Sequence, residues 1–115
     1  MSLSAQIRLM PDDATAYNNR GVAYREQGEI DKAIADCTES IRLEPDDATV
    51  HNNRGVAYKE QREYAKAIAD FTEAIRREPD DATAYSWRGM VYQEIGDEAK
   101  AEADFAKAKA LDRRR

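Results

Sequence analysis

Residues 48–81 read ATVHNNRGVAYKEQREYAKAIADFTEAIRREPDD, and stretches of the same length on both sides repeat their pattern. Residues 14–47 match this stretch at 25 of 34 positions, and residues 82–115 match it at 13 of 34. Neither comparison needs a gap. A fixed period without insertions indicates stacked copies of one supersecondary unit, each of which packs mainly on its neighbours.

Each copy is predicted to form two helices. In the middle copy, the first helix is expected over residues 48–61, after an aspartate that can cap its exposed amides. The second is expected over residues 64–77, because its larger apolar residues recur at the spacing of one helical face. These residues are Tyr64, Ile68, Phe71 and Ile75. Pro79 then ends the helix, since the residue before a proline is disfavoured in the α region.

Particular residue types recur at the same offsets in the three copies. The first copy holds Tyr17, Gly21, Tyr24, Ala33, Cys37, Ser40 and Pro45. The second holds His51, Gly55, Tyr58, Ala67, Phe71, Ala74 and Pro79. The third holds Tyr85, Gly89, Tyr92, Ala101, Phe105, Ala108 and, in place of the proline, Arg113. This pattern resembles the tetratricopeptide repeat over about nine tenths of the chain. The resemblance implies an all-α, right-handed superhelical array of antiparallel helix pairs that serves as a protein–protein interaction module or scaffold.

The whole chain, residues 1–115, is expected to be one domain with distinct ends. A half repeat over residues 3–13 precedes full repeats at 14–47, 48–81 and 82–115. Leu3 and Ile7 fall in register with the second helix of a repeat whose first helix is missing. We expect Leu3, Ile7 and Leu9 to leave apolar surface at this open end and to be partly uncovered. Truncation of a longer array explains this end better than a cap, and the open end predicts a homo-oligomer. In the last copy, charged residues replace apolar ones at Glu98, Glu102 and Lys109, which is typical of a terminal repeat.

Composition narrows the classes of partner. The net charge of −5 argues against nucleic-acid and anionic-membrane partners, because both require a basic face. No apolar run approaches the roughly 18 residues that a membrane span needs. Cys37 is the only cysteine, so no internal disulfide can form, and a reducing compartment such as the cytoplasm is compatible with the sequence.

Each copy carries an arginine followed sixteen residues later by an aspartate. The pairs are Arg20 with Asp36, Arg54 with Asp70, and Arg88 with Asp104. In an antiparallel hairpin this spacing brings the two side chains together. A charged binding stripe is one interpretation, but we favour an ion pair within each repeat, which replaces the leucine contact usual in the family.

One turn carries an unusual residue. Arg62 stands where the other copies have Gly28 and Gly96. If the backbone is left-handed there, the side chain costs on the order of 1 kcal/mol.

The resemblance places the first helix of each repeat on a concave groove, where a peptide or partner segment binds. The candidate lining residues are Asn18, Asn19, Val22, Arg25, Asn52, Asn53, Val56, Lys59, Ser86, Trp87 and Met90. A side-chain amide can pair with any peptide bond, whatever the ligand's sequence. Asn19 and Asn53 match the offset of the asparagine ladder in the peptide-binding array of O-linked N-acetylglucosamine transferases. A solvated polar face remains the alternative for these amides.

Trp87 takes the place of the next asparagine, and we expect its ring to project into the concavity rather than into the core.

The resemblance also suggests a comparison with the carboxylate clamp, the site at which chaperone-binding relatives hold a C-terminal carboxylate. Only Asn53 fits that clamp, because the sites that need cations hold Asn18, Thr83 and Trp87, and the other asparagine site holds Val22.

Nothing in the sequence indicates an enzyme. His51 is the only histidine and has no metal-ligand or triad partners at a recognisable spacing. We therefore predict no cofactor, no metal and no catalytic residue. Two alternatives stay open beside the interaction module: an array fragment that only self-associates, and a domain that recruits substrate to a larger enzyme.

Overall fold

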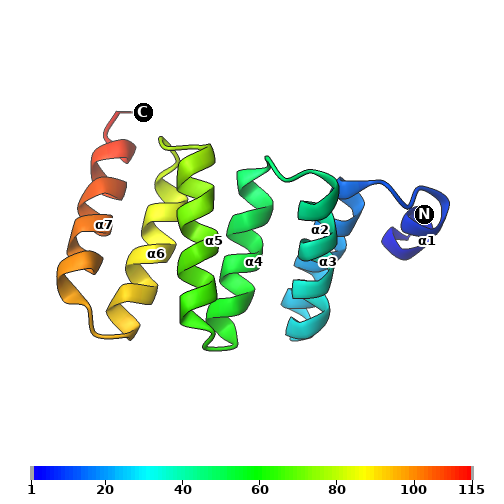
Figure 1. Cartoon of the computed structure of the whole chain (residues 1–115), viewed down its shortest axis with the longest axis horizontal. Coiled ribbons are helices and arrows are strands. Elements are labelled where there is room, and N and C mark those ends of the chain that lie inside the picture. The colour runs from blue at the N-terminus through cyan, green and yellow to red at the C-terminus, as the bar shows by residue number, and fades with distance from the viewer. Residues whose placement is uncertain (1, 115) are drawn as a thin grey trace.

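The computed structural model describes residues 2–114 as a row of seven helices, with the two termini at opposite ends (Figure 1). The helices are α1 (Leu3–Leu9), α2 (Ala14–Glu26), α3 (Ile30–Leu43), α4 (Ala48–Glu60), α5 (Tyr64–Arg77), α6 (Ala82–Glu94) and α7 (Glu98–Asp112). Antiparallel pairs follow one another along the chain, so the molecule is elongated, with extents of 47 × 29 × 20 Å. The predicted all-α array of helix pairs is confirmed.

The first helix of each repeat begins at an aspartate, as predicted. The side chains of Asp13, Asp47 and Asp81 accept backbone hydrogen bonds of 2.9–3.1 Å from residues in the first turn. Each cap satisfies an amide that would otherwise lack an acceptor. The expected bounds are also close: α5 spans the predicted residues, and α4 ends one residue earlier than predicted.

The turn between the two helices of each repeat requires a left-handed residue. Gly28 and Gly96 have φ angles of 81° and 86°, and Arg62 has a φ of 63° at the corresponding position. Arg62 therefore meets the condition under which the sequence predicted a conformational cost. It is strained relative to glycine, because its Cβ crowds the following carbonyl.

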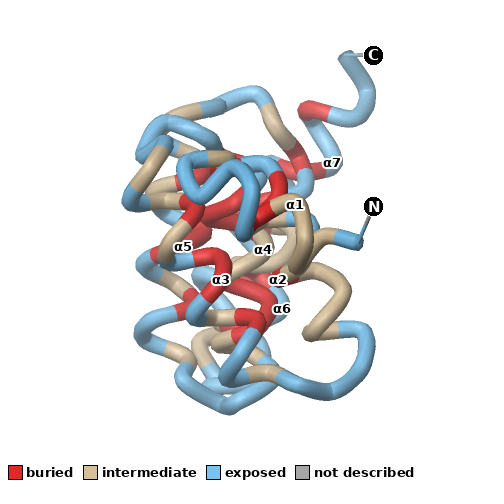
Figure 2. Tube along the Cα trace, turned by 90° about the vertical axis from the view of Figure 1, so that its right-hand side faces the viewer, coloured by how far each residue is buried: buried red, intermediate tan, exposed pale blue. Residues whose placement is uncertain are grey.

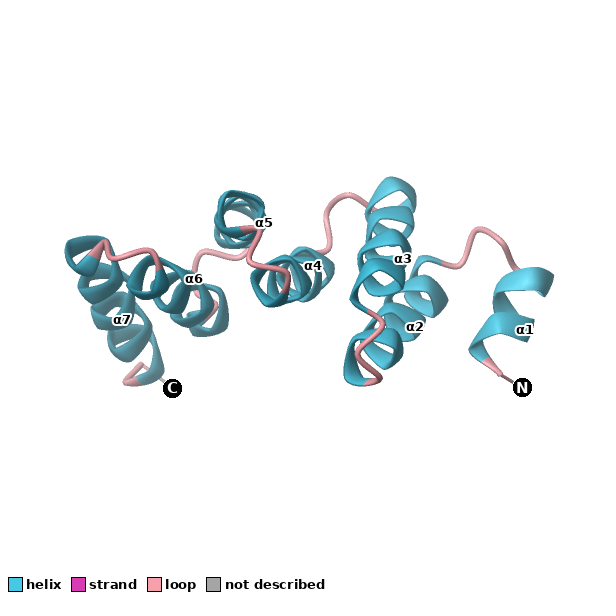
Figure 3. Cartoon of the chain, turned by 90° about the horizontal axis from the view of Figure 1, so that it is seen from below, coloured by secondary structure: helices cyan, strands magenta, loops and turns pink. Residues whose placement is uncertain are grey.

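The row curves, and the first helices form its inner side. Helix α4 contacts both α2 and α6, whereas within residues 2–114 no contact joins α3 to α5 or α5 to α7. Helices α3 and α5 accordingly lie on one side of the row, and α2 and α4 on the other (Figure 3). The inner side, formed by α2, α4 and α6, is called the concave face below.

The core runs between the helices, while the turns are exposed (Figure 2). Its central cluster contains Val56, Ala67, Phe71 and Val91, which come from three successive helices. Phe71 is fully buried, and its ring occupies the space beside Gly55. A Cβ on Gly55 would come within 2.7 Å of the ring, so glycine is required for this close approach of α4 and α5.

The N-terminal end differs from the expectation in one respect. Ile7 is 7% exposed and belongs to the core, so the prediction that it would be partly uncovered was wrong. Helix α2 packs against α1 and covers this side chain. Leu3 is half-buried and Leu9 is exposed, as expected, and Met10 is a further exposed apolar residue of this end.

Candidate functional site

The three arginine–aspartate pairs form within the repeats, as predicted. Each arginine donates two parallel hydrogen bonds of 2.7–2.9 Å to its aspartate, from Nε to Oδ2 and from Nη2 to Oδ1. The aspartates are buried, with 4–6% of their surface exposed. These bonds raise the pKa of each arginine, so the guanidinium groups remain charged. The pairs therefore hold the two helices of each repeat together and do not form a free binding stripe.

Each of these arginines also reaches the preceding repeat, which the sequence analysis missed. Its Nη1 atom donates a hydrogen bond of 3.2–3.3 Å to a hydroxyl on the helix that immediately precedes its own in the chain. The acceptors are Ser4, Thr38 and Thr72. They recur at intervals of 34 residues, so the period alone could have revealed them. Ala106 follows at the next interval, and the series of hydroxyls ends at α7.

His51 serves the same internal network. Its Nε2 lies 3.3 Å from the carbonyl oxygen of Pro45, and its Nδ1 lies 3.5 Å from Oδ1 of Asp70. Burial raises the pKa of Asp70, but hydrogen bonds from Arg54 and His51 outweigh this effect and leave the pKa below its usual value. The histidine is itself buried, so this arrangement is structural rather than catalytic.

All eleven candidate lining residues lie on α2, α4 and α6, but they are not equally accessible. Asn52 and Val56 are buried, contrary to the expectation that they would line a groove. The Oδ1 atom of Asn52 is enclosed and has no hydrogen-bond donor within residues 2–114. Asn19 and Met90 are exposed. The others are half-exposed: Asn18, Val22, Arg25, Asn53, Lys59, Ser86 and Trp87.

A hydrogen bond joins the amides of neighbouring repeats on this face. Asn53 Nδ2 donates to Asn18 Oδ1 over 2.9 Å, from α4 to α2. An amide group has two donor hydrogens and an acceptor oxygen, so Asn53 retains one donor and its own oxygen. The bond fixes the orientation of both side chains while leaving part of their capacity unused.

Trp87 lies partly in the core. Its ring stacks on Phe71, with the centroids 6.3 Å apart and the planes within 10° of parallel. The expectation that the indole would stay clear of the core was wrong, because Phe71 of the preceding repeat offers it an apolar surface. The ring remains half-exposed, and the Lys59 ammonium lies 6.0 Å from its centroid.

The cations of the concave face are bound to glutamates of the following repeat. Arg25 Nη1 lies 3.0 Å from Glu60 Oε1, and Lys59 Nζ lies 2.9 Å from Glu94 Oε1. The two pairs repeat at the 34-residue interval. The Lys59 ammonium, followed by the Tyr64 hydroxyl, lowers the pKa of Glu94, so this carboxylate remains charged. The four residues Arg25, Glu60, Lys59 and Glu94 are called the inter-repeat pairs below.

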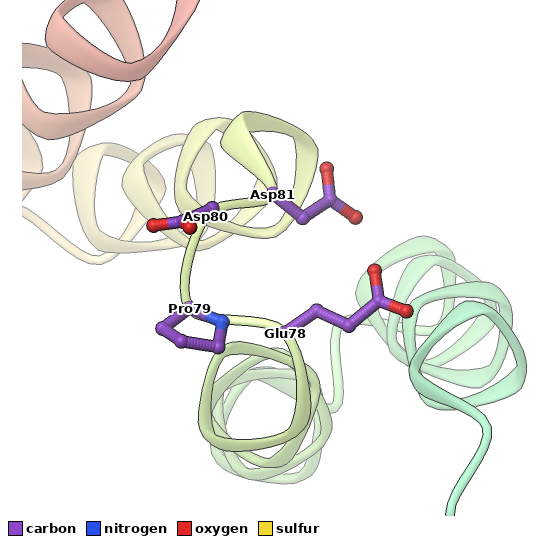
Figure 4. Close-up of a pocket in the computed structure, with 4 residues that line it drawn as sticks. All are labelled: Glu78, Pro79, Asp80 and Asp81. Atoms are coloured by element: carbon purple, nitrogen blue, oxygen red, sulfur yellow. The ribbon is translucent and has the colours of Figure 1, made fainter.

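Hollows in the surface also lie at the turns between repeats. One of them is lined by Glu78, Pro79, Asp80 and Asp81 (Figure 4). The Asp80 carboxylate points to the opposite side from those of Glu78 and Asp81, and Asp81 already caps α6. These three carboxylates do not converge on a common point, so the hollow does not bring them together as ligands for one cation.

Two further findings concern metal-binding clusters and membrane-spanning helices. Among residues 2–114, no group of three or more His, Cys, Asp or Glu side chains is placed to hold a metal ion. Over the same residues, no helix has both the length and the apolar character needed to cross a membrane.

Comparison with known families gives a match over most of the chain. Two profiles, each described as the tetratricopeptide repeat, match residues 14–47 and 48–81, and residues 71–103. No similar sequence was found among curated proteins.

Three solved structures illustrate the likeness in fold. A crystal structure of MamA has a TM-score of 0.93 and 27% identity, and it covers 97% of this chain. The chain spans 66% of that MamA molecule, so it corresponds to only part of it. The second TPR of Spaghetti (RPAP3), bound to the HSP90 peptide SRMEEVD, has a TM-score of 0.83 and 27% identity, covering 94% of this chain and 98% of its own. The Arabidopsis OM64 TPR domain has a TM-score of 0.85 and 27% identity, covering 89% and 84%.

Proposed function

The chain belongs to the tetratricopeptide-repeat family, and from this premise we propose that its concave face binds an extended segment of a partner protein. The observation that carries the proposal is the hydrogen bond from Asn53 to Asn18, which aligns amides of successive repeats along one face. The proposed role is non-catalytic: the module holds a partner in place. A solved relative described as bound to an HSP90 peptide supports this kind of role.

The spacing of the amides suits a peptide backbone. Packed helices lie about 8–10 Å apart, and an extended chain advances about 3.3 Å per residue. An amide from each repeat would then meet a peptide group at about every third residue. Asn19 and Asn53 are the proposed contacts, because both occupy the same offset and are at least half-exposed.

Trp87 and Met90 supply the apolar part of the proposed surface. Met90 is 40% exposed, and the half-exposed indole is supported from behind by Phe71. Rigid, partly exposed aromatic side chains are favoured as interface anchors. The proposed ligand therefore contacts amides on α2 and α4 and apolar side chains on α6.

A binding assay with a library of capped peptides of about ten residues tests the proposal. Such a peptide extends over about 33 Å, enough to cross α2, α4 and α6 at a helix spacing of about 8–10 Å. Trp87 is the only tryptophan, and its emission should shift to the blue on binding. Asn53→Ala and Asn19→Ala should each weaken binding about fivefold to tenfold, the loss expected for a hydrogen bond. Lys107→Ala, which alters an exposed residue of α7, is the control and should have no effect. Equal losses in all three variants, or no binding by any peptide, would contradict the proposal.

We also propose that the N-terminal end associates with a second copy of the chain. Leu9 and Met10 are 69% and 57% exposed, which is unusual for large apolar side chains so close together. Sedimentation should show dimers at high concentration and monomers for the Leu9→Ser variant. A strict monomer in the unmodified protein would exclude this association.

A further inference from the structure

The charges of the concave face limit the class of peptide that it can hold. Its two candidate cations, Arg25 and Lys59, are each within 3.0 Å of a glutamate of the next repeat. Glu26 lies beside Arg25 at the end of α2 and is exposed. Both of these cations are thus paired, Glu26 adds an exposed carboxylate, and a further cation near Glu94, Arg62, lies in the turn before α5.

We propose that the concave face accepts neutral or basic internal segments of a partner and rejects acidic segments and free C-terminal carboxylates. This inference rests on the proposed function, because it concerns the ligand of the same surface. A carboxylate clamp needs unpaired cations, but its cation positions here hold Asn18, Thr83 and Trp87. The two cations that the face does carry, Arg25 and Lys59, are already paired with glutamates.

The exchange that an acidic ligand would need is unfavourable. The charges of Arg25 and Lys59 are already balanced by Glu60 and Glu94, so an incoming carboxylate must either share a cation with the resident glutamate or displace that glutamate. It gains a full ion pair only by breaking one. Glu60 and Glu94 belong to the same molecule as the cations, so their effective concentration at the cations is high and they compete well with a free ligand. The displaced carboxylate would also remain nearby and repel the ligand.

The geometry of the second pair strengthens this resistance. Lys59 Nζ lies 2.9 Å from Glu94 Oε1 and 6.0 Å from the centroid of the Trp87 ring, a position that a cation favours. Removing Lys59 from Glu94 would therefore disturb contacts on both α4 and α6.

The decisive variants remove the glutamate of each inter-repeat pair and leave its cation, Arg25 or Lys59, unchanged. Glu60→Gln frees Arg25, and Glu94→Gln frees Lys59, while the amide keeps the size of the side chain. Glu63→Gln is the matched control, because it removes one negative charge from the exposed residue that precedes α5. Its partner, Lys66, lies on the same helix, so no cation of the concave face is released.

The probes are sets of capped peptides of about ten residues that share one sequence and differ in two positions, which hold serine, lysine or glutamate. A further set carries a free C-terminal carboxylate. In the unmodified protein, the glutamate and free-carboxylate peptides should bind about threefold to fivefold more weakly per charge than the serine peptides, as expected for partly exposed charges. Glu60→Gln and Glu94→Gln should remove most of this difference, and Glu63→Gln should not.

The outcomes separate this inference from the proposed function. Tightest binding of acidic or free-carboxylate peptides by the unmodified protein would overturn the inference and leave peptide binding intact. An equal effect of Glu63→Gln would also overturn it, because only the net charge would then matter. Failure of every peptide to bind would overturn both the inference and the proposed function.

Discussion

Arg54 and Asp70 are joined by two parallel hydrogen bonds of 2.8 Å, which connect α4 to α5 in the middle repeat. The aspartate is 4% exposed, so its negative charge is balanced mainly by the arginine and not by water. A third hydrogen bond, to Thr38, ties the same guanidinium to the preceding repeat. One side chain thus links three helices, and the same arrangement recurs at Arg20 and Arg88.

Removal of one partner of this pair should be far more costly than removal of both. We expect Arg54→Leu to lower the free energy of unfolding by about 3 kcal/mol, because it leaves a buried carboxylate without its cation. Adding Asp70→Ala should recover most of the loss, as measured by urea unfolding. Arg76→Leu, which breaks an exposed pair with Glu73, should cost less than about 1 kcal/mol. Additive losses in the double variant would contradict the coupling.

Gly55→Ala should destabilise the array although alanine favours helix. The new Cβ would lie 2.7 Å from the fully buried ring of Phe71, which cannot move without disturbing the core. We expect a net loss of about 1–3 kcal/mol, with the native helix content kept below the transition. Circular dichroism during thermal unfolding measures both quantities. An unchanged or raised melting temperature would show that α4 and α5 are not as close as described.

Arg62→Gly should stabilise the protein, because it relieves a left-handed residue. The gain should be at most about 1 kcal/mol, since glycine also increases the entropy of the unfolded chain. The reverse change, Gly28→Arg, is the matched control in the first repeat and should lower stability by a similar amount. Both can be followed as shifts in the urea midpoint, and a loss in both variants would contradict the assigned conformation.

The Cys37 thiol should be almost inert in the native protein. Burial raises its pKa to about 11, so very little thiolate is present at pH 8. A thiol reagent should react slowly with the native protein and rapidly after unfolding in guanidinium chloride. Fast reaction under native conditions would show that the side chain is accessible.

The same shift predicts a loss of stability in alkaline solution. The unfolded thiol ionises near its ordinary value of 9.0, whereas the native thiol keeps its proton up to about pH 11. The unfolded state binds fewer protons between these values, so the free energy of unfolding falls as the pH rises through that window. Cys37→Phe installs the ring that Phe71 and Phe105 supply in the other repeats and should reduce this fall. An equal fall in the variant would assign the effect to other groups.

The sequence was sufficient for the array and for its internal pairs, because both follow from a period of 34 residues. The regularly spaced apolar residues of α5 predicted one face of a helix. The sixteen-residue spacing of Arg54 and Asp70 predicted a contact between the two helices of a hairpin. The contacts to Thr38 and the inter-repeat pairs also recur at 34 residues, so they could have been predicted by comparing residues of successive repeats. Their distances depend on how the repeats stack, which the sequence alone does not define.

The candidate site was harder to predict, since accessibility depends on how closely the repeats pack. Asn52 and Val56 have the offsets of lining residues, yet flanking helices bury them because they belong to the middle repeat. Trp87 was assigned to the concavity from the register of the asparagines. Register alone does not reveal the apolar surface that Phe71 presents to the indole from the neighbouring repeat.

The most direct test of the account is a nuclear magnetic resonance titration with the tightest-binding capped peptide. We predict that shifts concentrate on the side-chain amides of Asn19 and Asn53 and on the indole N–H of Trp87, with smaller changes along α2, α4 and α6. Helices α3 and α5 should shift little, because they lie on the opposite side of the row. Shifts concentrated on α3 and α5, or on the acidic turns between repeats, would contradict the claim that the concave face binds the partner.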